Sequence, residues 1–216
     1  MKEYSDTMLG SGNVILLSVT ASRPNEKSKP LVYQIKAAIM RVKPVIWRRL
    51  LAPSGITFNK LHKIIQAAFG WQDCHLYEFN FGEVVVDIPD PDYPKDGVIN
   101  LNAKREKIDG LLTERKKCIY TYDFGDDWKH EIILEDTVFA DPEASYPICI
   151  DGAMHRPPED VGGVAGYGEF LKIINDANNP EHESYLEWAE KDTGGRKFSP
   201  DYFYIKETNR ALAKIK

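Results

Sequence analysis

The sequence has no cysteine pair at the short spacing of a zinc knuckle or a redox motif. Its three cysteines, Cys74, Cys118 and Cys149, stand far apart and are odd in number. This pattern supports neither a disulfide framework nor a zinc knuckle. Thiols that are not needed for disulfides are typical of a reducing compartment, so we expect a cytoplasmic protein.

Long apolar runs are missing as well. The run near the N-terminus extends only from Val14 to Val19, whereas a helix that crosses a bilayer needs about 20 apolar residues. Glu3 and Asp6 precede this run and no small-residue cleavage pattern follows it, which disfavours a signal peptide. We therefore expect no association with a membrane.

Positive charge is not in excess, because 28 lysines and arginines face 33 aspartates and glutamates, for a net charge of -5. Binding to duplex nucleic acid depends on neutralising phosphates, so a binding surface spread over the whole protein is not indicated. Solvated surface positions are the default expectation for the basic residues. Weak nucleic-acid contact stays open through the local basic groups Arg48, Arg49, Arg115, Lys116 and Lys117.

What is present fits one soluble globular domain: 216 residues, of which 43% are hydrophobic and 28% charged. A polar, proline-containing stretch from Ala21 to Pro30 is typical of a linker. We therefore divide the chain into a leader and linker at 1–30, partly disordered, and a single domain at 31–216.

Periodicity gives the elements of that domain. Alternating patterns predict strands over 31–42, 45–51 and 75–81. A helix is expected between Thr57, as its N-cap, and Gly70, as its C-terminal stop. Further helices are expected after the glycines near residue 166, from Pro180 and from Ser199-Pro200. The fold class is thus α+β, with covering helices and a helix-rich C-terminal third.

The stretch from Tyr120 to Glu135 predicts a β-hairpin whose turn concentrates carboxylates. Its two halves alternate with a period of two around Gly125-Asp126-Asp127. The alternation places His130 on an apolar face, where an imidazole needs a hydrogen-bond partner. Asp126 has the same parity as His130 and is a candidate partner, although a structural, partly buried histidine is the commoner case and is favoured over a functional one.

A second polar segment is the irregular stretch from Tyr146 to Gly168, which contains Pro157-Pro158-Glu159-Asp160. Ordered loops of this length are usually functional or packed over another element. We hypothesise that the hairpin and this loop form one polar pocket. Its expected residues are His75, Asp123, Asp126, Asp127, Trp128, His130, Arg156, Glu159 and Asp160. If the pocket holds a metal ion, Asp126, His130 and Glu159 are the expected ligands.

Several blocks occur in an order that resembles the plasmid pRiA4b ORF-3-like family. They include Pro44-Val45-Ile46-Trp47-Arg48-Arg49, His75-Leu76-Tyr77-Glu78-Phe79, Tyr122-Asp123-Phe124-Gly125-Asp126-Asp127-Trp128-Lys129-His130 and Pro157-Pro158-Glu159-Asp160-Val161-Gly162-Gly163. The chain departs from the pattern at Val161, where a Cys is usual, and at Ser199, where an Asp is usual. The resemblance implies a compact α+β fold with a mixed, rolled sheet and an association with plasmids and mobile elements; it brings no established activity.

Three functions are therefore compatible with the sequence. The first is a binding or accessory module of a mobile element, which uses the polar pocket for a small ligand or a protein partner. The second is a metal-assisted hydrolase or nuclease that uses the same carboxylates and histidines. The third is nucleic-acid binding through the basic segments.

Overall fold

The computed structural model describes residues 30–215, so the predicted leader up to residue 29 lies outside the described residues. Across these residues a single mixed sheet contains the strands in the order β5-β4-β3-β6-β7-β1-β2-β8. Only β4 and β5 are parallel neighbours in it. The strands are β1 (Leu31–Ile39), β2 (Trp47–Pro53), β3 (Tyr77–Asn80), β4 (Val84–Asp87), β5 (Ile99–Asn102), β6 (Lys117–Tyr122), β7 (Trp128–Phe139) and β8 (Ile148–Ala153).

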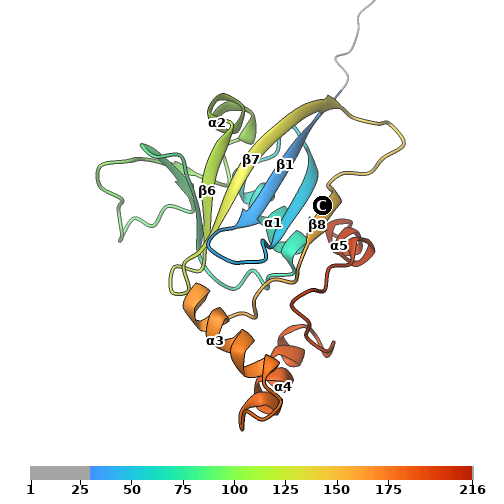
Figure 1. Ribbon diagram of the computed structural model, residues 1–216. Helices are drawn as coiled ribbons and strands as arrows, with labels where there is room; N and C mark the ends of the chain where they lie inside the picture. Colours follow the sequence, from blue (N-terminus) through green and yellow to red (C-terminus); the bar gives the residue numbers. More distant parts are fainter. Residues whose placement is uncertain (1–29, 216) are drawn as a thin grey trace, which may run out of the picture.

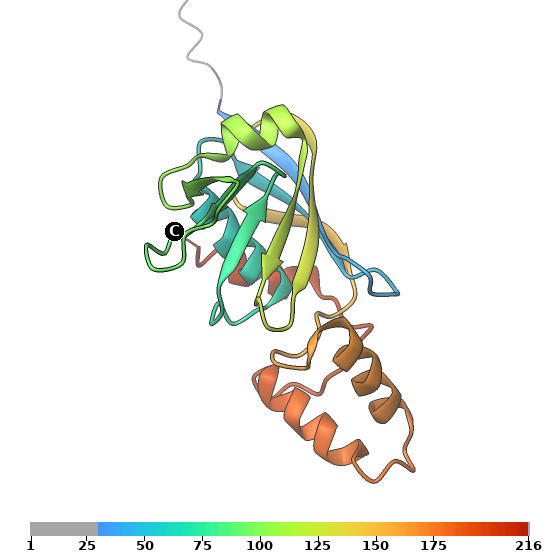
Figure 2. The ribbon, with the colours of Figure 1, turned by 90° about the vertical axis from the view of Figure 1, so that its left-hand side faces the viewer.

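The sheet curves around one helix (Figures 1 and 2). The helices are α1 (Phe58–Phe69), α2 (Ile108–Arg115), α3 (Gly163–Asn175), α4 (His182–Asp192) and α5 (Ile205–Leu212). α1 lies on the concave face and buries Phe58, Leu61 and Ile65 in the core. Its ends follow the sequence prediction: the Thr57 side chain accepts a hydrogen bond from the Lys60 amide, and Gly70 ends the helix at φ 83°.

The predicted hairpin is confirmed as β6 and β7, which pair in an antiparallel register. Tyr120, Tyr122, Trp128 and His130 all point into the core, as the alternation requires. The turn is longer than a two-residue hairpin turn. Asp123 and Asp127, rather than Gly125, adopt positive φ angles of 57° and 54°, and aspartate is among the few residues that tolerate this conformation.

The helix-rich C-terminal third is confirmed, and its helices occupy two places. α5 packs beside α1 and against β8, where the Asn209 side chain bonds both backbone groups of Cys149 and so satisfies some of the exposed sheet edge. α3 and α4 pack on each other at the lower end of the molecule (Figure 1). The polar loop between β8 and α3 therefore lies where the sheet body meets a helical lobe.

The last helix begins at Ile205, later than the predicted start at Ser199-Pro200. The residues in between are used differently, because the Pro200 carbonyl accepts a hydrogen bond from the His155 amide and Tyr202 donates to Glu207. Proline has no amide proton to donate, so Pro200 fits the first turn of a helix as well as an extended segment in which only its carbonyl oxygen is bonded.

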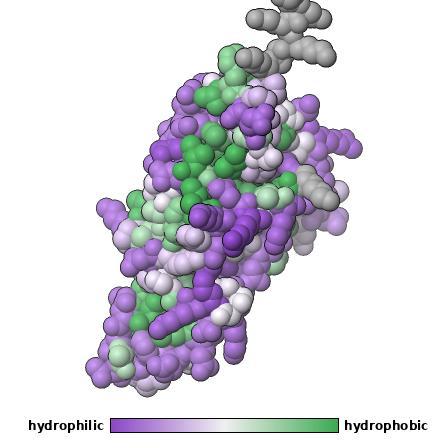
Figure 3. Space-filling view, turned by 90° about the vertical axis from the view of Figure 1, so that its right-hand side faces the viewer, coloured by the Kyte–Doolittle hydropathy of each residue, from purple (hydrophilic) through white to green (hydrophobic). Residues whose placement is uncertain are grey.

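The surface carries hydrophilic and apolar residues. Figure 3 shows the side that faces right in Figure 1, where hydrophilic residues surround a band of apolar ones. Exposed Leu31 and Phe139 belong to an apolar groove that also includes Pro142 and Tyr146. Among the described residues, no helix has both the length and the apolar character that a membrane crossing requires.

Candidate metal centre

The register of β3 and β6 places His75 beside Asp123. Tyr77 pairs with Tyr122 across the two antiparallel strands, so the residues just before β3 meet those just after β6. The Asp123 amide extends the ladder by donating to the Leu76 carbonyl at 2.9 Å. His75 Nε2 consequently lies 3.7 Å from Asp123 Oδ2.

The loop before α3 brings two further carboxylates to the same point. His75 Nε2 is 3.9 Å from Glu159 Oε2 and 3.3 Å from Asp160 Oδ1. Glu159 is held by the Gln72 amide and by the Tyr122 hydroxyl, which both donate to its Oε1. Three carboxylates from two distant segments thus face one imidazole nitrogen.

Two atoms of this cluster are buried and have no hydrogen-bond partner among residues 30–215, His75 Nε2 and Glu159 Oε2. Glu159 is only 6% exposed, and burial is the main cause that raises the pKa of its carboxyl. Buried polar atoms are paired in nearly all proteins, and an exception calls for an explanation such as an ion.

The spacing of these atoms is that of metal ligands. Hydrogen-bonded pairs approach to about 2.7–3.0 Å, whereas ligands that share one ion at about 2.0–2.2 Å in a tetrahedral arrangement lie about 3.3–3.6 Å apart. The 3.3 Å distance from His75 to Asp160 lies in the second range, and the 3.7 Å distance to Asp123 lies just above it. Asp123 also uses its other oxygen, Oδ1, to accept from the Gly125 amide, which fixes the orientation of the carboxylate.

Two groups of three possible ligands overlap at His75. One consists of His75, Asp123 and Asp160, and the other of Cys74, His75 and Glu159; within each group the ligand atoms lie within 4.8 Å of one another. Asp123 and Asp160 both have left-handed backbones, with φ of 57° and 55°. Such conformations cost free energy in non-glycine residues and cluster at functional sites.

Neither of the other two carboxylates in the hairpin turn belongs to these groups. Asp126 Oδ2 accepts from the Gly162 amide at 3.1 Å and thereby joins the hairpin to the start of α3. The two segments are in such close contact that a Cβ atom at Gly163 would lie 2.4 Å from the Asp126 carbonyl oxygen. Asp127 forms an exposed ion pair with Lys129.

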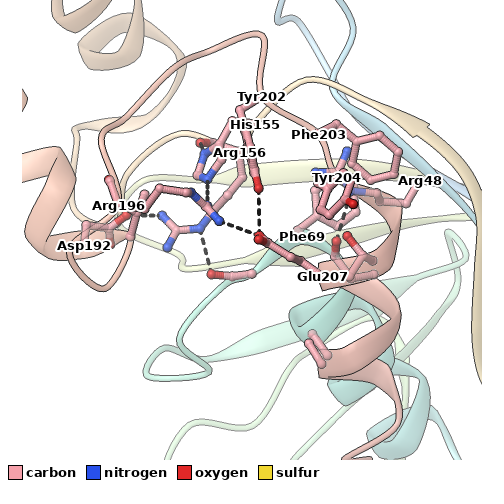
Figure 4. A pocket seen from close by; sticks show the side chains of 16 residues that line it. Arg48, Phe69, His155, Arg156, Asp192, Arg196, Tyr202, Phe203, Tyr204 and Glu207 are labelled. Carbon is pink, nitrogen blue, oxygen red and sulfur yellow. Dashed lines mark hydrogen bonds and ion pairs between the residues drawn. The ribbon is translucent and has the colours of Figure 1, made fainter.

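Trp128 and Arg156 support the structure around the site and are not among the possible ligands. Trp128 is fully buried, with its ring 5.8 Å from that of Trp71 and 6.5 Å from that of Tyr167, so it packs α3 against the sheet. Arg156 donates to the Gly70 and Pro157 carbonyls. It also pairs with Asp192 at 2.6 Å (Figure 4). Its guanidinium thus supports the loop that presents Glu159 and Asp160 and is not paired with their side chains.

His130 lies in the core and outside both groups of possible ligands. Its expected pairing with Asp126 is wrong, since Nδ1 donates to the Trp128 carbonyl at 3.0 Å and Asp126 bonds Gly162. The Phe69 and Tyr120 rings lie 5.1 and 5.2 Å away. Burial lowers the pKa of His130 to about 4. The alternation predicted the correct face of the strand, but that face belongs to the core rather than to the turn.

We expect this burial to make the protein sensitive to acid. Unfolding restores a pKa near 6.5, so the unfolded state binds the extra proton and stability falls as the pH drops from about 6.5 towards 4. Between pH 7 and 4.5, His130 should account for a loss of about 2 to 3 kcal/mol. Urea unfolding at both values should show this loss in wild type and a smaller one in His130→Phe. An equal loss in both proteins would contradict the assignment.

The sequence interpretation missed Cys74 and Tyr122 as members of the site. The Cys74 Sγ atom lies 3.7 Å from the Tyr122 hydroxyl oxygen, and the Cys74 amide donates to the same oxygen. Cys74 adjoins His75 in the sequence, and Tyr122 is the last inward residue of its strand before Asp123. These sequence positions, next to His75 and Asp123, could have indicated that Cys74 and Tyr122 belong to the site. Only the β3–β6 register shows that they are neighbours.

Of the five basic residues proposed for nucleic-acid contact, Arg48 is not available. The expected solvated surface position is wrong for Arg48, because β2 lies between β1 and β8 and Arg48 is 3% exposed. Arg49 is paired with Glu135 and Asp151. Exposed basic residues remain at the end of α2 and the start of β6: Arg115, Lys116 and Lys117.

The match to known proteins covers both the sheet body and this site. The model of the family described as plasmid pRiA4b ORF-3-like protein matches residues 31–207. The chain belongs to this family. It is 38% identical over 160 residues to the uncharacterized protein y4hQ of Sinorhizobium fredii, a match that spans 73% of this chain and 80% of that protein.

A protein of known structure shares the fold. The crystal structure of a protein of unknown function from Methanosarcina mazei Go1, MM3350, has a TM-score of 0.71 and 35% sequence identity, and the match covers 83% of this chain and 98% of that one. The descriptions of these relatives name no activity. Val161 follows the Glu159-Asp160 pair in this chain. The site therefore has no thiol at the position where a Cys is usual in the plasmid pRiA4b ORF-3-like pattern.

Proposed function

We propose that this protein is a cytoplasmic binding module, encoded with plasmids or mobile elements, whose ligand is a divalent transition-metal ion such as Zn²⁺. The proposed ligands are His75, Asp123 and Asp160, with Glu159 as a buried carboxylate beside them. One observation carries the proposal: the buried Nε2 of His75, which has no hydrogen-bond partner in the described part of the chain, faces three carboxylates at 3.3–3.9 Å. The thiols of Cys74, Cys118 and Cys149 are free, which supports a reducing compartment such as the cytoplasm.

The donor types favour a borderline metal over magnesium. One imidazole nitrogen with carboxylate oxygens suits zinc, manganese or iron, whereas magnesium prefers oxygen ligands alone. The centre also joins the sheet body, through His75 and Asp123, to the loop that precedes the helical lobe, through Asp160. Because the unfolded chain lacks this arrangement, metal binding should stabilise the fold.

We expect metal-free protein to bind Zn²⁺ with micromolar or tighter affinity, measured by competition with a chromophoric chelator. Zinc at about 100 times its dissociation constant should stabilise the fold by about 2.7 kcal/mol and raise the melting temperature by about 5 °C or more. His75→Ala removes a ligand and Asp160→Asn replaces an anionic ligand oxygen by a neutral amide oxygen, so each should weaken binding about 100-fold.

Two matched variants serve as controls. Asp127→Asn removes an equally acidic side chain of the same turn that pairs with Lys129, and His182→Ala removes a histidine on α4; both should bind zinc as wild type does. Cys74→Ser distinguishes the two groups of possible ligands and should leave affinity unchanged within about threefold. Binding that survives in His75→Ala, or that is lost equally in Asp127→Asn, would refute the centre.

A metal-assisted hydrolase is the second candidate. It is favoured by the exposure of the Asp160 side chain, 73%, because a catalytic metal keeps an open position for water or substrate. Glu159 Oε2 is buried, lacks a hydrogen-bond partner among residues 30–215 and lies 3.9 Å from His75 Nε2, which suits a proton acceptor.

A further inference from the structure

A groove between α3 and α4 opens beside the proposed metal centre. Its cavity has a volume of about 400 Å³. The two features share Asp160, whose Oδ1 faces His75 and which also forms one wall of the groove together with Val161. We call this cavity the α3–α4 groove. Its remaining lining comes from the two helices: Gly166, Glu169, Phe170, Ser184, Tyr185 and Trp188.

Aromatic rings form much of the groove. The Phe170 ring lies 6.2 Å from that of Tyr185 and 5.9 Å from that of Trp188. Phe170 is fully buried, whereas Trp188 is 36% exposed. Aromatic walls in a pocket are the usual setting for a flat apolar group of a ligand.

The charge of the groove restricts that ligand further. Two carboxylates line it, those of Asp160 and Glu169, and no lysine or arginine among residues 30–215 does. Lys172 pairs with Glu169 in the open at 2.7 Å, but both side chains are about 70% exposed, and such a pair contributes little. Phosphate and carboxylate groups are repelled by this wall, while an ammonium group is attracted and also favours aromatic faces.

We infer that the α3–α4 groove is the specificity pocket of the metal centre and takes a neutral or cationic ligand that places an aromatic group on Trp188 while a second group coordinates the metal. The inference rests on the proposed metal centre. It favours amide-like or amine-bearing ligands over nucleic acid, because the polyanionic backbone of a nucleic acid would meet Asp160 and Glu169.

Hydroxamates of graded size test the pocket on zinc-loaded protein. Acetohydroxamate supplies only the metal-binding group, 3-phenylpropanohydroxamate adds a ring, and phenylalanine hydroxamate adds a ring and an ammonium. By isothermal titration calorimetry the ring should improve affinity about tenfold or more, because it buries an aromatic surface. The ammonium should give a further gain of about threefold at low salt that fades at high salt.

Two variants assign the gain to the groove. Trp188→Ala removes the exposed ring, and Ser184→Trp fills the groove without removing a core side chain. Each should abolish the advantage of the ring and leave the zinc affinity unchanged. Tyr93→Ala, which removes an exposed aromatic ring outside the lining of the groove, should keep the advantage.

The outcomes separate the two proposals. If zinc does not bind wild type, the metal centre itself is wrong. If zinc binds but the ring brings no gain, or the gain persists in both groove variants, the centre stands and the specificity pocket is refuted. A phenylalanine hydroxamate that binds more weakly than its neutral counterpart would overturn the preference for positive charge.

Discussion

Replacing Arg48 with methionine is expected to lower the free energy of unfolding by about 3 to 5 kcal/mol. The Arg48 guanidinium donates from Nε to the Ala68 carbonyl, from Nη1 to those of Trp47 and Ala153, and from Nη2 to that of Met154, at 2.8–3.0 Å. It therefore joins β2, the end of α1 and the end of β8. Methionine fills the space but leaves these acceptors without donors.

The faces of the guanidinium are covered as well as its edges. The Phe69 and Phe203 rings lie 4.9 and 4.4 Å from its central carbon (Figure 4). Burial lowers the pKa of Arg48 to about 10, so the side chain stays charged at neutral pH. Lysine is no substitute, because one ammonium cannot reproduce a planar fork of donors.

Arg49→Met is the matched control for this measurement. Arg49 is the next residue on the same strand and pairs with Glu135 and Asp151 at the surface, where ion pairs contribute about 1 kcal/mol or less. Urea unfolding should separate the two variants by at least about 2 kcal/mol. Similar stabilities for Arg48→Met and Arg49→Met would show that the carbonyl contacts are replaced by water at little cost.

The sequence predicted those features that depend on local periodicity. The alternation around the hairpin gave both strands and the inward face of Tyr120, Trp128 and His130, and the N-cap at Thr57 with the stop at Gly70 gave α1. The same alternation could not tell Arg48 from Arg49 as the buried one. That choice depends on β8 pairing with β2, a contact between residues about 100 positions apart.

The proposed metal ligands show the same limit of local periodicity. Parity placed Asp126 with His130, but two left-handed aspartates in the turn redirect the chain, so Asp126 binds the Gly162 amide instead. His75 reaches Asp123 through the β3–β6 register and meets Asp160 through a loop more than 80 residues away. The sequence identified two segments rich in carboxylates, the hairpin turn and the loop before α3. Only the tertiary structure shows which of these carboxylates lie next to His75.

Asp192 is expected to affect both the stability of the fold and the proposed metal site. Its buried carboxylate accepts from Arg156 Nη1 at 2.6 Å, from Gln72 Nε2 at 2.8 Å and from the Glu159 amide at 3.3 Å. It thus connects the end of α4 to the segment that follows α1 and to the loop that carries Glu159. We expect Asp192→Ala to cost about 3 to 5 kcal/mol, because it leaves the Arg156 charge buried without a partner.

A double variant separates the lost pair from the buried charge that remains. Arg156→Met combined with Asp192→Leu removes both charges and should recover much of the loss, since an apolar pair of similar volume is often as stable as a buried ion pair. Glu190→Ala, in the last turn of the same helix and exposed, should change stability by less than about 0.5 kcal/mol. A double variant no more stable than Asp192→Ala would mean that the Gln72 and Glu159 contacts, rather than the charge on Arg156, account for the cost.

The same variant, Asp192→Ala, is expected to weaken the proposed zinc binding by about tenfold, because residues that support a ligand-bearing loop typically contribute 10- to 100-fold to metal affinity. The Glu159 amide loses its acceptor in Asp192→Ala, and Asp160 follows directly in the chain, so the ligand loses its fixed position while His75 and Asp123 remain in place. Zinc titration at a temperature where the variant is fully folded measures this effect apart from stability. An unchanged zinc affinity would show that Asp192 stabilises the junction of sheet and helical lobe without positioning the ligands.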